Sequence, residues 1–122
     1  MKVLLSIKPE YAEKILTGQK RYEFRKAIFK TTVEKVVIYA TSPIKKIIGE
    51  FEIDCILSLN PNELWERTMF YAGVNKEFYD KYFNGKGVGY AIKVKNVRRY
   101  ASHFDLNYFN IKQAPQSFIY IA

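Results

Sequence analysis

The sequence predicts an α+β fold: a small, mostly antiparallel β-barrel, closed or nearly closed, with a helix after the first strand and a two-helix insertion. Residues 46–59 and 88–95 alternate apolar with polar or small side chains, which is the two-residue period of β-strands. The segment between them carries two successive pairs of helix start and stop signals. Strands that pair mainly antiparallel, with helices gathered at their ends, are typical of the α+β class.

Length and composition predict one globular domain over residues 1–122. Hydrophobic residues make up 48% of the chain and charged residues 26%, which is enough apolar material for a core without metals or disulfides. The lone cysteine, Cys55, cannot form an internal disulfide. No apolar stretch near residue 1 is long enough for a signal peptide or a membrane span, so we expect a cytoplasmic protein without a membrane partner.

The first 25 residues predict a strand, a helix and a second strand. Residues 2–7 form a short apolar run, after which Pro9 starts a helix and Gly18 ends it. Residues 21–25 alternate two aromatic with three charged side chains, so the strand that they form has one charged face. This charged face is the first candidate for a binding surface.

Two further strands are predicted at 35–40 and 46–59. The turn at 41–43 separates them, because its hydroxyls and its proline interrupt the ladder of hydrogen bonds. The longer strand should have an apolar face and an acidic face: Ile47, Gly49, Phe51, Ile53, Cys55 and Leu57 on the first, and Glu50, Glu52 and Asp54 on the second. Gly49 interrupts the apolar face and predicts a bulge that curves the strand.

The remaining elements are two helices and two strands. Asn60 caps the first helix and Gly73 ends it, whereas Asn75 and Gly85 bound the second. The strand at 88–95 should present its small and basic residues outward and pair with the long acidic-faced strand. A last short strand is predicted at 117–121.

The chain is strongly basic, which bears on its partners. Lysine and arginine outnumber acidic residues by 20 to 12, giving a net charge of +8 and a pI near 9.5. Residues 81–99 contain basic residues and no acidic one, and residues 14–30 contain Glu23 as their one acid. Small basic domains are attracted to polyanions, so nucleic acid is the first partner to consider. The alternative is that the charge only keeps the protein soluble.

Residues 9–25 resemble the signature of the ASCH family, a branch of the PUA-like superfamily, which reads G-x-K-x-x-E-x-R after a short helix. All four lettered positions are present in this chain, as Gly18, Lys20, Glu23 and Arg25. Later landmarks also resemble stand-alone bacterial and archaeal ASCH proteins, at 39–43, 64–65 and 115–118. The resemblance covers nearly the whole chain and implies a PUA-like β-barrel.

The ASCH resemblance also implies a function. In the family, the motif lines a cleft between the barrel and the first helix, and this cleft is proposed to bind RNA or a nucleotide. The resemblance therefore implies a module that binds RNA or a modified base, with a regulatory role in transcription or translation as one option and DNA as another possible ligand. Binding would use a basic cleft around Lys20, Glu23 and Arg25.

The residue pattern agrees in part with a shared cleft. Glu23 and Arg25 lie two apart on one strand face, and Lys20 follows a glycine turn that frees it from strand parity. Arginine offers a planar fork to phosphate or a base edge, lysine a mobile charge, and a carboxylate accepts from exocyclic amines such as that of cytosine. The alternative interpretation is a surface ion-pair ladder, worth about 0–1 kcal/mol per pair.

Weaker candidates for the same site are polar residues at strand ends and in loops: Ser6, Lys8, Thr41, Ser42, Gln116 and Ser117. Three aromatic residues, Tyr22, Tyr39 and Trp65, are expected to form core or barrel wall and not stacking platforms for bases.

A second hypothesis is a small metal-independent hydrolase, because relatives in the superfamily include acetylcytidine amidohydrolases and ribonucleases. Lys20 would then be the catalytic base or nucleophile, which requires a lowered pKa. Two departures from those amidohydrolases count against this role. The resemblance implies that those enzymes have a threonine at the position of Glu23. The carboxylate of Glu23 should raise the pKa of Lys20. They also carry a catalytic glutamate where residues 71–74 of this chain contain no acid.

Other chemical groups are expected to be structural. The row Glu50, Glu52 and Asp54 should form a solvated face opposed by lysines of the neighbouring strand. His103 should be a surface or turn residue in an irregular stretch, and no zinc-ligand spacing includes it, so we expect neither metal nor cofactor. A third hypothesis is a regulatory or protein-interaction domain that does not use the cleft for nucleic acid. The ligand and the oligomeric state are not predicted.

Overall fold

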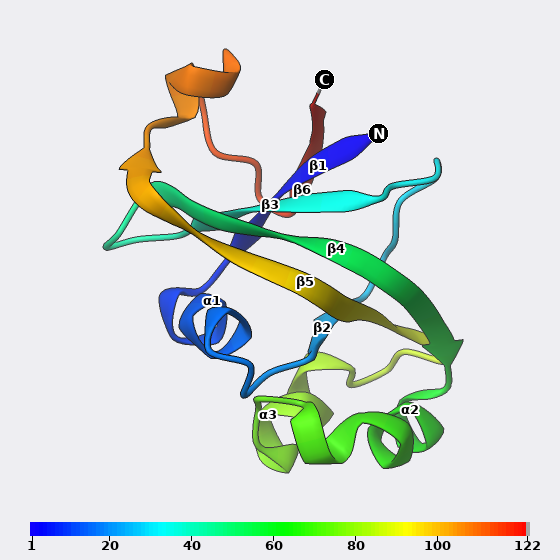
Figure 1. Cartoon of the computed structure of the whole chain (residues 1–122). Coiled ribbons are helices and arrows are strands. Elements are labelled where there is room, and N and C mark those ends of the chain that lie inside the picture. The colour runs from blue at the N-terminus through cyan, green and yellow to red at the C-terminus, as the bar shows by residue number, and fades with distance from the viewer. Residues whose placement is uncertain (122) are drawn as a thin grey trace.

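The computed structural model describes residues 1–121, in which a six-stranded mixed sheet curls into a half-barrel, in the strand order β2-β5-β4-β3-β1-β6 (Figure 1). The strands are β1 (Lys2–Ile7), β2 (Tyr22–Arg25), β3 (Lys35–Ala40), β4 (Lys46–Leu59), β5 (Gly89–Phe104) and β6 (Phe118–Ile121). The helices are α1 (Pro9–Leu16), α2 (Pro61–Thr68) and α3 (Lys76–Tyr82), with short 3₁₀ turns at Met69–Tyr71 and Leu106–Phe109. The predicted α+β barrel fold is confirmed.

Strand pairing follows the mostly antiparallel pattern that the sequence predicts. Only one of the five pairings in residues 1–121 is parallel, that of β1 with β3. The predicted pairing of the two long strands is confirmed as β4 with β5. The parallel β1–β3 pair needs a long connection, and α1 and β2 lie within it.

The fifth strand is longer than predicted. It continues to Phe104, so His103 is an exposed residue of β5 and does not lie in an irregular stretch. The sequence concealed this continuation because apolar alternation stops near Lys95 and Asn96 has a positive φ of 49°. The second half of β5 is a strand because it pairs with the first half of β4: Gly49 pairs with Arg99 and Ile47 with Phe104.

The predicted single apolar face of β4 is wrong. Ile47 is buried in one apolar cluster, whereas Ile48 and Phe51 are buried in another, and Cys55 is exposed. The cause is irregular pairing with β5, whose register shifts between Ile47 and Gly49 and again twice further along. Each bulge adds a residue to one strand and moves the following side chains to the opposite face. The bulge that Gly49 predicts is therefore confirmed, together with two that the alternation did not indicate.

Helices α2 and α3 cover the first part of β5, on the face that the sequence predicts to point outward. Ala91 is fully buried there with Leu64, Tyr79 and Phe83, so its side of the strand forms part of the core. Both predicted helix caps are confirmed: the side chain of Asn60 accepts from the Glu63 amide at 3.0 Å, and that of Asn75 from the Phe78 amide at 2.8 Å. This packing brings Ala72, and Tyr79 of α3, into one apolar cluster with Phe24 of β2. Helix α3 lies near β2 (Figure 1).

No helix within residues 1–121 is long and apolar enough to cross a membrane.

Replacing Gly49 with alanine is expected to lower the free energy of unfolding by about 1–3 kcal/mol, which urea denaturation would measure. A Cβ atom at this position would lie 2.7 Å from the Arg98 carbonyl oxygen and 2.9 Å from Leu16 Cδ2, so the bulge would have to open. Gly87→Ala is the matched control, because a Cβ there meets nothing within 4 Å. An equal effect of both substitutions would contradict this account of the bulge.

Candidate functional site

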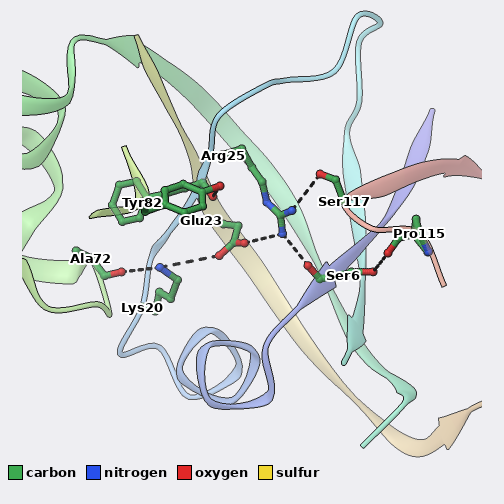
Figure 2. A network of polar contacts seen from close by, with 9 residues as sticks. Ser6, Lys20, Glu23, Arg25, Ala72, Tyr82, Pro115 and Ser117 are labelled. Atoms are coloured by element: carbon green, nitrogen blue, oxygen red, sulfur yellow. Dashed lines mark hydrogen bonds and ion pairs between the residues drawn. The ribbon is translucent and has the colours of Figure 1, made fainter. Parts of the chain in front are cut away.

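A cavity of about 510 Å³ lies where the end of β1, the start of α1, strand β2, helix α3 and the segment before β6 meet. Lys20, Glu23 and Arg25 all line it. They form a continuous row of polar contacts that runs from the Ala72 carbonyl at one end to Ser6 and Ser117 at the other (Figure 2). The structure thus brings the three charged residues of the motif together in one concave site.

Lys20 is buried at one end of this row, with 2% of its surface exposed. Gly18 reverses the chain after α1 with a φ of +86°, and the Lys20 amide then donates to the Lys14 carbonyl at 3.0 Å. The Lys20 Nζ atom donates to the Ala72 carbonyl at 2.6 Å. Residue 73 must be glycine for this approach, because a Cβ there would lie 2.5 Å from the Lys20 side chain.

The pKa of Lys20 is lowered from its usual 10.5 to about 8, chiefly because burial disfavours the charged ammonium. Glu23 raises this pKa, whereas Lys14 and Arg25 lower it. The sequence-based expectation that the Glu23 carboxylate raises the pKa of Lys20 is confirmed, but the net pKa is lowered. Loss of hydration outweighs the attraction of Glu23.

Glu23 is the centre of the row and is 7% exposed. Its Oε2 atom accepts from an Arg25 guanidinium nitrogen at 2.8 Å, while its Oε1 atom lies 3.9 Å from Lys20 Nζ. The exposed ion-pair ladder considered from sequence does not describe this arrangement, because Lys20 and Glu23 are two of the three buried polar or charged residues among residues 1–121. Their burial costs solvation that an exposed ladder would not lose.

Arg25 joins the two edges of the curled sheet. From the edge strand β2 its guanidinium donates to the Ser6 carbonyl on β1 at 2.9 Å and to the Ser117 hydroxyl before β6 at 3.2 Å. Its Nε atom is buried and has no hydrogen-bond partner within residues 1–121. Among the buried side-chain nitrogen and oxygen atoms of that part of the chain, it alone lacks one. Arg25 therefore bridges the two edges of the curled sheet, and its buried Nε–H donor is left unused.

Aromatic side chains form another wall of the cavity. Phe78 and Tyr82 on α3 lie nearly parallel, with ring centroids 6.2 Å apart and an angle of 11°. The Lys8 ammonium lies 5.4 Å from the Phe78 ring centre, and that of Lys26 lies 4.6 Å from the Tyr82 ring centre. Both lysines are exposed at the cavity, so positive charge flanks an aromatic surface.

The other predicted site residues have separate placements. Lys8, Thr41, Gln116 and Ser117 line the cavity, and Ser42 lies outside its lining. Ser6 lines it too, but its hydroxyl donates to the Pro115 carbonyl at 2.7 Å and so anchors the segment before β6. Tyr39 is buried, and Tyr22 and Trp65 pack against the core beneath α2 and α3, as expected of wall residues.

Sequence reasoning missed the aromatic wall and Lys26. Tyr11, Phe78 and Tyr82 are not among the candidate site residues that the sequence indicates, yet all three line the cavity. One signal was available: residues 78–83 hold four aromatic side chains, more than one buried face of so short a helix can use. Lys26 carried no signal, since it lies outside the family motif.

The acidic row on β4 is held by basic side chains of the neighbouring strands. Lys93 lies 3.6 Å from Asp54, and Lys95 pairs with Glu52 in the strand register. Glu50 instead contacts Lys35 of β3 at 2.8 Å and accepts a hydrogen bond from Tyr100. The row is spread over several partners and does not converge as an acid/base pair would.

Comparisons with known proteins agree on one family. A family profile described as the ASCH domain matches residues 5–104. A protein named ASCH domain-containing ribonuclease, from Zymomonas mobilis, is 35% identical over 83 residues, which are 67% of this chain and 56% of that protein. The crystal structure of ASCH from the same organism superposes with a TM-score of 0.91 and 28% identity, covering 99% of this chain and 87% of that chain.

One similar protein is much longer than this chain. A Ureaplasma parvum protein named ATP synthase subunit alpha is 31% identical over 120 residues, and this chain spans 98% of its own length but 15% of that protein. The matching segment is therefore a small part of a larger polypeptide there.

Proposed function

The chain belongs to the ASCH domain family, and from this we propose that it binds RNA by holding one unpaired nucleotide in the cavity of Lys20, Glu23 and Arg25. The observation that carries the proposal is the gathering of three charged side chains, two of them buried, around an open cavity instead of on a flat surface. Charges are costly to bury, so their retention in a concave site is typical of ligand recognition.

The walls of the cavity suit a nucleotide. Bases stack on aromatic rings, and Tyr11, Phe24 and Tyr82 line this cavity. Its volume of about 510 Å³ lies within the range of sites for small ligands. RNA bases are read most often when they are unstacked and turned out of a helix, which agrees with a concave site of this kind.

Basic residues around the cavity would hold the phosphates. Lys8 and Lys26 are exposed there and lie over aromatic rings, where a phosphate of the same strand could reach them. The basic segment 81–99 is a weaker track than the sequence suggests, because Lys81, Lys93 and Arg99 each lie within 4 Å of a carboxylate. The Lys8 and Lys26 side is thus the proposed path of the backbone.

Lys20→Met and Arg25→Ala are each expected to weaken binding of a short, labelled, single-stranded RNA by at least about tenfold, measured by fluorescence anisotropy. Wild-type affinity should also fall as salt is raised, because phosphate contacts release counterions. Lys112→Ala is the matched control: Lys112 is exposed and outside the cavity lining. Unchanged affinity in both cavity variants, checked to be folded by circular dichroism, would overturn the proposal.

A second candidate is RNA hydrolysis with Lys20 as the general base. The lowered pKa of about 8 favours it, because part of Lys20 is then neutral near neutral pH and can accept a proton. The similar Zymomonas mobilis protein is named a ribonuclease. For the other hydrolase considered from sequence, residues 71–74 do lie beside Lys20, since Ala72 binds its ammonium, but they carry no acid.

Incubation separates the two candidates. Single-stranded RNA and acetylated cytidine would each be mixed with wild-type protein and with Lys20→Met, and the products separated by chromatography. Turnover by the wild type that the variant lacks would establish the hydrolase. Equal, background-level products in both samples would retire it and leave binding as the function.

A further inference from the structure

The three charged residues of the cavity each keep at least one unused hydrogen-bonding position. Lys20 Nζ has three N–H donors and makes one hydrogen bond, to the Ala72 carbonyl. The Glu23 Oε1 atom has only the 3.9 Å contact with that ammonium, because Arg25 binds the other oxygen. The Arg25 Nε–H is buried without a partner among residues 1–121. A buried donor without a partner, such as this Nε–H, is unfavourable unless a ligand completes it.

The order of these groups forms a pattern. Along the row they stand as Lys20, then Glu23, then Arg25, with the carboxylate between the two cations (Figure 2). A ligand edge that meets this row therefore encounters a donor, an acceptor and a donor. All three residues line the same cavity.

Building on the proposed function, we propose that the cavity selects a base whose pairing edge reads acceptor, donor, acceptor, which is the imide edge of uracil or thymine. One carbonyl oxygen would accept from Lys20, the ring N3–H would donate to Glu23, and the second carbonyl oxygen would accept from Arg25. The imide edge is symmetric, so it matches the row in either orientation. All three hydrogen bonds would be charge-assisted, because two have a cationic donor and the third has an anionic acceptor.

The other bases leave unsatisfied or repelling pairs at the same positions. Cytosine would turn the lone pair of its N3 toward the Glu23 carboxylate and its amine toward a cation. Adenine likewise presents an amine and a ring lone pair. Guanine matches two positions but turns its exocyclic amine toward the second cation. In a buried site each such mismatch leaves a polar group unpaired, which is what makes polar sites selective.

Selection has to come from this polar row, because the rest of the cavity is tolerant. Every base has a face that stacks on aromatic rings, so Tyr11 and Phe24 do not distinguish one base from another. This differs from the sequence-based view of Glu23 as an acceptor for the amine of cytosine. Its position between two cations suits a ring N–H flanked by two carbonyl oxygens.

The test is a ligand series on the intact protein, measured by isothermal titration calorimetry. UMP is expected to bind at least about tenfold more tightly than CMP, and 3-methyluridine monophosphate, which lacks the N3–H, should lose a similar factor. Affinities of CMP or of the methylated nucleotide within about threefold of UMP would overturn the inference. No substitution is needed, so misfolding cannot obscure the result.

Further ligands and one variant sharpen the result. dTMP and dUMP carry the same edge and should bind more tightly than dCMP. Tighter binding of UMP than of dUMP assigns RNA as the source of the base, and the reverse order assigns DNA. Glu23→Gln places an amide at the central position, so its ratio of UMP to CMP affinity should fall by about tenfold.

Failure of the inference and failure of the proposed function give different results. If all of these nucleotides bind equally and Lys20→Met weakens them all, the cavity binds nucleotides without reading an imide edge, and only the inference is overturned. If neither the nucleotides nor single-stranded RNA bind, both are overturned.

Discussion

Glu23→Gln is expected to lower the free energy of unfolding at neutral pH by about 3–5 kcal/mol, measured by urea denaturation. The substitution keeps the shape of the side chain and removes its charge, so Lys20 and Arg25 lose the carboxylate between them. Lys20 is 2% exposed, and water cannot replace the missing counter-charge. The pKa of Lys20 should also fall below about 8, since Glu23 is the group that raises it.

Asp80→Asn is the matched control for this loss of charge. Asp80 lies 2.8 Å from Lys76, the same N···O distance that separates Glu23 from Arg25. The Asp80 side chain is 54% exposed, whereas that of Glu23 is 9% exposed. Exposed pairs contribute about 0–1 kcal/mol, so Asp80→Asn should have a small effect. A similar small loss in both variants would show that Glu23 is not a buried counter-charge.

Lys20→Met is expected to change how stability depends on pH. In the folded protein the pKa of Lys20 is about 8, and in the unfolded chain it returns to about 10.5. Below pH 8 both states hold the proton, and the cost of burying the ammonium is fully present. Between these two pKa values the unfolded state binds more protons at this site, so the contribution of Lys20 to stability rises with pH.

The rise should amount to about 3 kcal/mol across this window, and methionine removes it. The measurement is urea denaturation of wild type and Lys20→Met at about pH 7 and pH 10.5. The stability of the variant relative to the wild type should fall by that amount at the higher pH. Taking the difference cancels titrations that both proteins share. Lys112→Met, at an exposed position, should give a constant difference, and a constant difference for Lys20→Met would contradict the buried charge.

The limits of most elements could be read from the sequence because their signals are local. A proline starts α1 and a left-handed glycine follows it, and the asparagine caps of α2 and α3 act on amides three residues away. The bounds of β4 follow from its apolar run and from the turns beside it. Such signals depend on near neighbours in the chain and survive without knowledge of the fold.

Which side chains of a strand are buried, and how long the strand is, depended on partners distant in the sequence. The register shifts between β4 and β5 decided which side chains of β4 are buried, and a single residue decided the matter at each bulge. The second half of β5 has little apolar alternation of its own and is a strand because β4 pairs with it. Neither fact is written in a local pattern.

For the site, the sequence determined the three charged residues of the motif, the strand face that Glu23 and Arg25 share, and the glycine turn that releases Lys20. The tertiary structure alone decided that Lys20 and Glu23 are buried, that α3 adds an aromatic wall, and that the Ala72 carbonyl binds the lysine ammonium. The reason is physical: a residue type and its spacing set what a side chain can donate or accept, whereas solvation and pKa depend on which distant segments exclude water from it.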